Sequence, residues 1–301
     1  MLTANYQLSQ PITFLQRIIR QGGPEISEYD QLAQIADELH AAHKAGRFSD
    51  IDLQILQESF GAEELNHTLH GHSISRPYGY AGDFMIIDKI YREYVTPDKR
   101  FAKWDLLWHS QAACKAVRNR KSYFKQVMFD RLAGKPKFSL LNVASGPARD
   151  LAELYALIEP GILETTCIEA DERAIAYAKE LNKANLDSIR FIQQNIFRHE
   201  DDAQYEMVWS AGLFDYFTDR VFVKILRRFI SWTQPGGEII IGNFNTENPS
   251  RSFMELFGDW YLHHRSANRL TELALEAGIS KRNIRVEQES AGVNLFLHVR
   301  V

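Results

Sequence analysis

Hydrophobic residues in the first part of the chain recur at the spacing of an α-helix. The clearest apolar stripe consists of Leu32, Ile35, Ala36, Leu39 and Ala42. The same spacing returns after Ser49 and Asp50, which can cap a helix over residues 51–60, and again over 101–108 and 123–132. Such stripes are most simply core positions. We therefore expect residues 1–134 to form an all-helical N-terminal domain.

The pattern changes at Phe138, where short apolar runs begin to alternate with helical segments. Strands are expected over residues 138–144, 164–169, 189–193, 205–210, 238–244, 284–289 and 293–300. Helices are expected near residues 147–158, 172–184, 219–233 and 266–277. Helical crossovers between most strands predict a doubly wound α/β sheet over residues 135–301. A short turn, Ser290 to Gly292, separates the last two strands, which should therefore pair as an antiparallel hairpin.

Composition narrows the class of protein. The 301 residues carry a formal net charge of −4 and no long run of Lys or Arg, which disfavours nucleic acid as a partner. No apolar run approaches the ~20 residues of a membrane span, and the N-terminus lacks the basic start and apolar core of a signal peptide. Cys114 and Cys167 show no metal-ligand spacing, so free, packed thiols and no metal site are expected. A cytoplasmic protein is expected, with a homodimer as one form of assembly.

A turn of small residues follows the first expected strand. Ala144, Ser145 and Gly146 form this turn, and Pro147 opens the next helix. Small side chains let a ligand approach the backbone, and the N–H groups of a helix start favour a polar or anionic ligand group. The turn is a candidate cofactor cradle, although similar turns also occur where nothing binds.

Polar residues mark the ends of the following strands. Glu169 ends the second strand about 20 positions beyond the turn, where this architecture places a carboxylate that accepts hydrogen bonds from ribose hydroxyls. A plain surface carboxylate is the alternative. Asn195 and Ile196 follow the third strand, where an amide can read a purine edge and an apolar side chain can pack on its ring. Ser210 ends the fourth strand and Gly212 lies in the turn after it, near the strand ends where ligands bind.

Residues 76–84, RPYGYAGDF, do not show the pattern of a packed helix. They contain two glycines, a proline and two tyrosines directly before a helical segment. One interpretation is a lid in which Arg76, Tyr78 and Tyr80 face a ligand, because loops on a rigid scaffold often carry function. The alternative is a structural loop in which Asp83 caps the next helix.

These segments together resemble a known family. The order of NVASGPA, IEAD, IQQN, VWSAGLFDYF and QPGGEIIIGNF, over about the last 165 residues, is similar to class I S-adenosylmethionine-dependent methyltransferases. That family has a Rossmann-like, seven-stranded sheet whose last strand is antiparallel, in agreement with the expected hairpin. The resemblance implies S-adenosyl-L-methionine as cofactor.

The resemblance also implies roles for the strand-end residues. Ala144, Ser145 and Gly146 would line the methionine part of the cofactor. Glu169, with the adjacent Ala170, would bind the ribose hydroxyls. The remaining implied cofactor contacts are Asn195 and Ile196 at the adenine, together with Tyr80, Ser210 and Gly212.

A narrower resemblance concerns the acceptor. RPYGYAGDF combined with NFNTENPSRSFMELFGDWYLHHRS resembles the bacterial methyltransferases of 3-hydroxypalmitic acid methyl ester biosynthesis. This resemblance implies O-methylation of a carboxylate on a fatty-acid-derived or other small acid. The alternatives are N- or O-methylation of another metabolite, and a cofactor-binding interaction protein without turnover. A nicotinamide-dependent dehydrogenase is disfavoured, because the turn lacks the glycine spacing of that class.

Methyl transfer from a sulfonium depends mainly on orientation and a dry pocket. A carboxylate acceptor is already ionised near neutral pH and needs no general base, whereas a hydroxyl or amine would use one. The candidate catalytic residues are Tyr80, Asp83, Asp215 and His264. The candidate acceptor contacts are Arg76, Tyr216, Trp260, His263 and Arg265. Arg76 or Arg265 can pair with a carboxylate, and His263 can also serve as a base.

Overall fold

A computed structural model describes residues 9–61, 66–200 and 202–301. Its contacts divide the chain into two compact units, which are considered separately below. The helical unit comprises Met1–Lys115 and Pro249–Tyr261, and the sheet unit comprises Ala116–Asn248 and Leu262–Val301. The division differs from the expected border after residue 134, because most of one long helix groups with the sheet and a late segment groups with the N-terminal helices.

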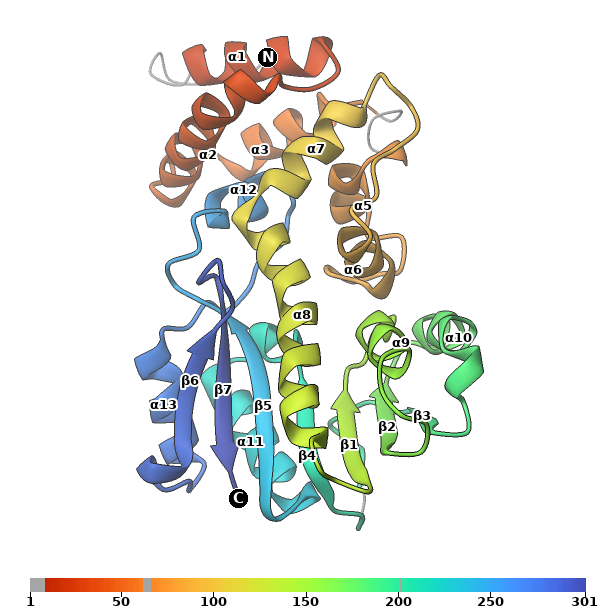
Figure 1. Ribbon diagram of the computed structural model, residues 1–301. Coiled ribbons are helices and arrows are strands. Elements are labelled where there is room, and N and C mark those ends of the chain that lie inside the picture. The colour runs from red at the N-terminus through yellow and green to blue at the C-terminus, as the bar shows by residue number, and fades with distance from the viewer. Residues whose placement is uncertain (1–8, 62–65, 201) are drawn as a thin grey trace. The chain divides into compact units, whose positions relative to one another are not determined.

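The helical unit contains helices of one to four turns (Figure 1). They are α1 (Ser9–Arg20), η2 (Ile26–Glu28), α2 (Tyr29–Lys44), α3 (Asp50–Glu58), α5 (Leu69–Ser75), α6 (Phe84–Tyr91), α7 (Ala102–Ser110) and α12 (Arg251–Leu256). The apolar stripe predicted for residues 32–42 is buried in α2, and α12 packs against α2. Ser49 caps α3 by accepting the Asp52 N–H, as predicted. Ile51 was expected in the core but lies exposed on the outer face of α3.

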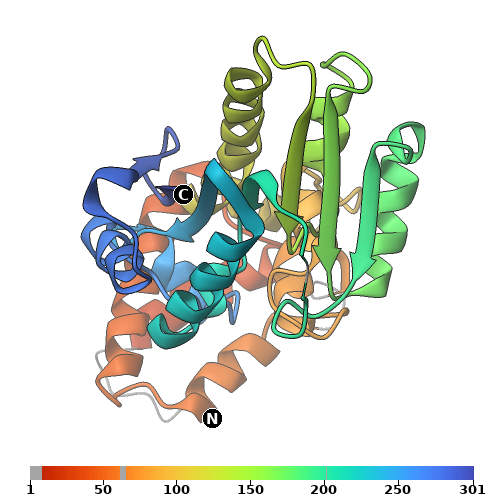
Figure 2. The same cartoon turned by 90° about the horizontal axis from the view of Figure 1, so that it is seen from below.

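The sheet unit is built on seven strands in the order β3-β2-β1-β4-β5-β7-β6. Their bounds are β1 (Phe138–Val143), β2 (Leu163–Glu169), β3 (Ile189–Gln193), β4 (Tyr205–Ser210), β5 (Thr233–Phe244), β6 (Ile284–Gln288) and β7 (Asn294–Arg300). The first five strands are parallel, and β7 is antiparallel to both β5 and β6. The predicted Rossmann-like sheet with its antiparallel final strand is therefore confirmed (Figures 1 and 2).

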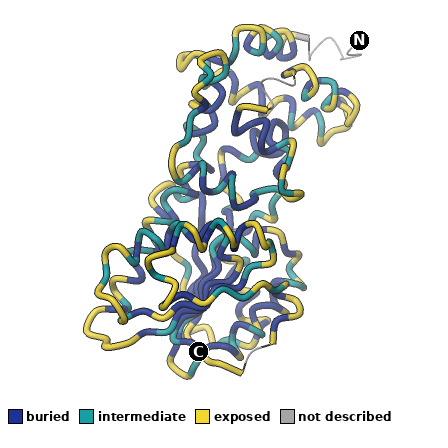
Figure 3. Tube along the Cα trace, turned by 90° about the vertical axis from the view of Figure 1, so that its right-hand side faces the viewer, coloured by how far each residue is buried: buried dark blue, intermediate teal, exposed yellow. Residues whose placement is uncertain are grey.

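Helices cover both faces of this sheet. They are α8 (Ala112–Leu132), α9 (Arg149–Tyr155), α10 (Glu172–Leu181), α11 (Asp219–Trp232) and α13 (Ala267–Glu276), with short turns η3 (Lys183–Asn185), η4 (Phe214–Tyr216) and η5 (Lys281–Asn283). Neighbouring residues of one strand enter opposite cores: Leu140 packs with α8, α9 and α10, whereas Leu141 packs with α11 and α13. This alternation follows from the two-residue period of a strand. Consequently the central strands are buried on both faces (Figure 3).

Two element boundaries differ from the sequence expectations. Helix α9 begins at Arg149, because Ser145 to Ala148 form a separate turn in which the Ala148 N–H donates to the Ser145 carbonyl. Strand β5 begins at Thr233, before the expected start at residue 238, and it includes Pro235 to Gly237, whose composition is typical of a turn. Gly236 there has a φ of +81°, and its N–H donates to the carbonyl of Val301 beside it.

Two further expectations concern cysteine and membranes. Both cysteines are free and buried, as predicted. Among the described residues, the structure shows no helix with the length and apolar character required to span a bilayer.

Candidate functional site

The turn after β1 has an unusual backbone. Ala144 and Ala148 have φ angles of 54° and 49°, in the left-handed region that residues with a Cβ seldom adopt. Gly146 between them has a φ of 54° as well. Such strained positions cluster at ligand-binding sites, where the surrounding structure holds them in place. Here the N–H of Ala144 donates to the Ile168 carbonyl at 2.8 Å, which anchors the turn to the end of β2.

The turn also has open space beside its backbone and a buried side-chain hydroxyl. A Cβ built on Gly146 would meet no atom within 4 Å, so the backbone faces open space there. The hydroxyl of Ser145 is buried beside the Cys167 thiol, a weak hydrogen-bond partner, and makes no hydrogen bond to a nitrogen or oxygen of the described residues. A buried polar atom of this kind is costly unless a partner satisfies it. These features fit the predicted cofactor cradle.

Glu169 connects the ends of β1 and β2. Its Oε2 accepts the N–H of Gly146 at 2.9 Å, and its Oε1 accepts the N–H groups of Ala170 and Asp171 at 2.8 and 3.0 Å. An ionised carboxylate has about four acceptor positions, so it can still accept hydroxyl donors. Asp171 caps α10 by accepting the Arg173 N–H. Glu169 therefore lies at the turn with a fixed orientation, as a ribose ligand requires.

The other predicted cofactor residues lie at the same edge of the sheet. Asn195 is exposed after β3, and its Oδ1 accepts the Phe197 N–H. Ile196 is buried in the core on the α11 side, so at most its edge can meet an adenine. Ser210 is buried at the end of β4, and its hydroxyl donates to the carbonyl of Val143 at 3.1 Å. Ser210 thus ties β4 to β1 where the strand order reverses, the usual ligand position in such sheets.

Arg120 on α8 is a residue that the sequence analysis missed. It is buried, and its Nη1 donates weakly to the Ala211 carbonyl at 3.4 Å. A Cβ on Gly212 would lie 2.9 Å from the same nitrogen, so the turn after β4 accommodates the guanidinium only because it has glycine there. A signal existed: Arg120 interrupts the apolar series Ala113, Val117, Phe124 and Val127, all buried on one side of α8.

Two buried carboxyls lie within the electrostatic reach of Arg120. Burial raises the pKa of Asp215 to about 7, although the Phe244 N–H, donated to its Oδ1 at 2.7 Å, and the charges of Arg120 and Arg265 oppose the rise. Burial likewise raises the pKa of Asp150 to about 6, against the opposing effects of the Leu151 N–H and Arg120. The carboxyl edge of the sheet therefore holds two buried cations, Arg120 and Arg265, and two acids whose pKa values lie near neutral pH.

Gly242 in β5 sets the position of the turn after β4. A Cβ there would lie 2.3 Å from the Ala211 carbonyl oxygen, and this oxygen is backbone and cannot easily move. We expect Gly242→Ala to lower the free energy of unfolding by about 1–3 kcal/mol, the usual range for overpacking. Urea unfolding checks this value; an unchanged midpoint would contradict the close approach.

The predicted acceptor residues of the sheet unit lie beside Asp215. The N–H of His263 donates to the Asp215 carbonyl at 2.7 Å, while the side chains of His263 and Tyr216 are exposed. His264 lies near Asn248, with 3.2 Å between the ring Nε2 and the amide nitrogen. Arg265 is buried and uses every guanidinium nitrogen on Asp219, Asn243 and the carbonyls of Phe214, Phe217 and His263.

The predicted residues of the helical unit form their own network. Asp83 caps α6 by accepting the N–H groups of Met85 and Ile86, and both of its oxygens contact His72 Nε2 at 2.9–3.0 Å. Arg76 pairs with Asp259. The remaining two differ in exposure: Tyr80 is exposed, and Trp260 is buried. The capping role expected of Asp83 is confirmed, and roles of residues 76–84 toward a ligand stay predictions.

Comparisons with known proteins agree with this architecture. Residues 140–237 match a family described as a methyltransferase domain. A search of curated proteins finds no match. The chain is similar to the crystal structure of a possible exported protein from Bordetella parapertussis, with a TM-score of 0.63, 16% identity and coverage of 97% of this chain and 96% of that one.

Two further similar structures are methyltransferases. One is magnesium protoporphyrin IX methyltransferase from Synechocystis PCC 6803 with bound S-adenosylhomocysteine (TM-score 0.53, 13% identity, 76% of this chain and 98% of that one). The other is the S-adenosylmethionine-dependent methyltransferase SibL in its apo form (TM-score 0.52, 12% identity, 97% and 96%). At these identities the likeness shows the fold. The matched domain and this fold together support a class I methyltransferase with S-adenosylmethionine as its cofactor.

Proposed function

We propose that this protein transfers a methyl group from S-adenosylmethionine to a carboxylate oxygen of a small acid. The observation that carries the proposal is the turn after β1, with its left-handed backbone, its open space at Gly146 and the buried Ser145 hydroxyl, which has at most a weak thiol partner. The acidic strand end of Glu169 beside this turn supplies the second half of a nucleoside site.

We assign the cofactor contacts to the carboxyl edge of the sheet. Ala144, Ser145 and Gly146 would line the methionine part, and Glu169 would accept hydrogen bonds from the ribose hydroxyls. Asn195, with the edge of Ile196, would contact the adenine. When bound, the cofactor supplies an electrophilic methyl group on a sulfonium; the residues of this chain orient it and exclude water.

The buried charge of Arg120 favours an anionic group at this edge. Arg120 lies against the turn after β4, and a guanidinium there can attract a carboxylate of the cofactor or of the acceptor. Arg265 was a candidate for this task, but its donors are all engaged by Asp219, Asn243 and backbone carbonyls. We therefore assign Arg265 to positioning of the loop that holds Asp215.

A second candidate function is favoured by one observation. The pKa of Asp215 is raised to about 7 by burial, which suits a general base for a hydroxyl or amine acceptor. A carboxylate acceptor needs no base, and an ionised Asp215 would repel it. The two candidate functions therefore predict opposite pH profiles.

We expect kcat/KM for an acid substrate to fall about three- to tenfold as the pH rises through 7, because Asp215 then becomes charged beside an anionic acceptor. Asp215→Asn should flatten this fall. Initial rates of S-adenosylhomocysteine release from pH 5.5 to 8.5 measure both profiles. A rise through pH 7 that the Asn variant abolishes would favour the general-base candidate instead.

The proposal is tested by offering the enzyme 3-hydroxy fatty acids of increasing chain length with S-adenosylmethionine. We expect S-adenosylhomocysteine release and a product ester that has gained one methyl group by mass spectrometry. The matched control is the same set of acids supplied as amides, which lack the carboxylate. Turnover that is equal for acids and amides would refute carboxylate methylation.

A further inference from the structure

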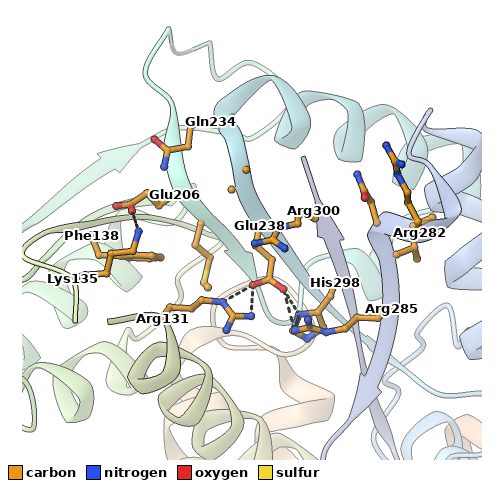
Figure 4. A pocket seen from close by; sticks show the side chains of 15 residues that line it. Arg131, Lys135, Phe138, Glu206, Gln234, Glu238, Arg282, Arg285, His298 and Arg300 are labelled. Atoms are coloured by element: carbon orange, nitrogen blue, oxygen red, sulfur yellow. Dashed lines mark hydrogen bonds and ion pairs between the residues drawn. The ribbon is translucent and has the colours of Figure 1, made fainter. Parts of the chain in front are cut away.

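A second pocket lies at the opposite edge of the same sheet. It is formed where β1, β4, β5 and β6 begin and where β7 ends, with a volume of about 600 Å³ (Figure 4). Its lining includes Arg131 from α8, Gln234 and Glu238 from β5, and Arg300 from β7. The volume lies within the range of small-molecule sites. The cofactor turn follows the other end of β1, so this pocket is separate from the cofactor site.

Three of the five Lys and Arg side chains of this pocket already bind carboxylates. Glu238 accepts hydrogen bonds from Arg131 at 2.8 Å, from His298 at 2.8 Å and from Arg285 at 3.1 Å. Burial alone would raise the pKa of Glu238, but the His298 and Arg131 contacts lower it to about 2, so the group is ionised. Lys135 pairs with Glu206 at 2.8 Å. These ion pairs hold the charged side chains on this side of the pocket in place.

Two arginines of the lining do not bind either of these carboxylates. The guanidinium groups of Arg282 and Arg300 have no ion pair or hydrogen bond with any described residue, and Figure 4 shows Arg282 apart from the dashed network. The side-chain amides of Gln234 and Asn283 likewise make no hydrogen bond within the described chain. The lining holds five Lys or Arg side chains and two carboxylates, an excess of three, in a protein whose net charge is −4.

We propose that this pocket binds a phosphorylated small molecule, with Arg282 and Arg300 on the phosphate oxygens. A phosphate monoester carries a charge of about −1.5 to −2 at pH 7 and three acceptor oxygens, which match two guanidinium forks and two amides. A carboxylate offers one charge and leaves part of these donors unsatisfied. The volume leaves space for the organic part of the ligand, against Phe138, Met207 and Ile284.

The experiment is calorimetric titration of the full-length protein with pyrophosphate at low ionic strength. We expect saturable binding of one equivalent, weakened at least tenfold in the double variant Arg282→Gln/Arg300→Gln. Because both side chains are exposed, these changes should leave the melting temperature unaltered. The matched control is Arg47→Gln, which removes an exposed arginine of the helical unit that has no ion pair with any residue in the described ranges, and it should leave the affinity unchanged.

Three results would overturn the proposal. They are no saturable binding of pyrophosphate, equal affinity in the wild type and the double variant, and a loss of affinity in Arg47→Gln as large as in the double variant. Succinate, a dicarboxylate, is titrated in parallel: weaker binding than pyrophosphate supports the phosphate class, and equal or tighter binding contradicts it. Since no step involves S-adenosylmethionine, the outcome is independent of the proposed methyl transfer.

Discussion

Replacing Glu169 by alanine will weaken S-adenosylmethionine binding by about 10- to 100-fold. The expected loss comes from the hydrogen bonds that the ribose hydroxyls donate to the charged carboxylate. Each such bond contributes about 1.5–3 kcal/mol, and water that enters the variant site recovers part of this. The fold should change little, because the N–H groups of Ala170 and Asp171 that Glu169 accepts lie near solvent. Isothermal titration measures the affinity, and thermal unfolding measures the stability.

The matched control is Glu164→Ala. Glu164 lies in the same strand, but it is exposed toward the opposite edge of the sheet and pairs with Lys137. Its removal should leave cofactor affinity unchanged. If both variants bind with the affinity of the wild type, Glu169 is a surface carboxylate that only braces the turn at Gly146, and the ribose assignment fails.

Replacing Arg120 by methionine will produce the largest stability loss, about 3–5 kcal/mol near neutral pH, as when one partner of a buried charge cluster is removed. The variant keeps the apolar stem of the side chain but removes the cation that faces Asp150 and Asp215. Both acids have raised pKa values in the folded state, and without Arg120 these values should rise further.

The pH dependence of this loss follows from the direction of the shifts. An acid with a raised folded-state pKa favours folding below its ordinary pKa near 4, and this contribution is lost as the pH rises through the folded-state value, about 6 for Asp150 and about 7 for Asp215. The Met variant should therefore be closest to the wild type at pH 5 and furthest at pH 8. Urea unfolding at both values measures this, with Arg120→Lys as the charge-retaining control. An equal loss at both pH values would assign the effect to packing.

The strands could be predicted to within one or two residues, with β5 as the exception. Apolar runs such as that of β4 are buried on both faces and bounded by turn residues, so the sequence marks their ends. Strand β5 starts five residues earlier than expected at Thr233, because Pro235 to Gly237 have the composition of a turn. Their strand geometry depends on bonds to Val301, which is distant in sequence and invisible to a local pattern.

The candidate cofactor site was predictable because the ends of parallel strands meet at one edge. Glu169 and the turn at Gly146 lie far apart in sequence, yet the pairing of β1 with β2 brings them into hydrogen-bond contact. Arg120 was missed because a single arginine in a helical pattern resembles a solvated position. Arg120 is buried because α8 packs on the sheet and because Gly212, which has no side chain, leaves space for the guanidinium.

Arg265, which the sequence suggests as an acceptor contact, is engaged by other groups of the chain in the structure. An arginine in a loop near candidate site residues suggests a ligand contact, and sequence gives no count of the carbonyls that surround it. In the fold, Arg265 is 3% exposed and joins the loops around η4, β5 and the start of α13. These contacts form only when η4, the end of β5 and the loop before α13 come together in the fold, and a pattern along the sequence cannot show this.

Calorimetric titration of the purified protein with S-adenosylmethionine and S-adenosylhomocysteine, with NAD as the control ligand, tests the central claim most directly. We expect micromolar binding of both sulfur nucleosides at one site per chain and no binding of NAD. Absence of binding by both, in protein whose unfolding is cooperative, would contradict the assignment of the β1 turn and Glu169 as the cofactor site.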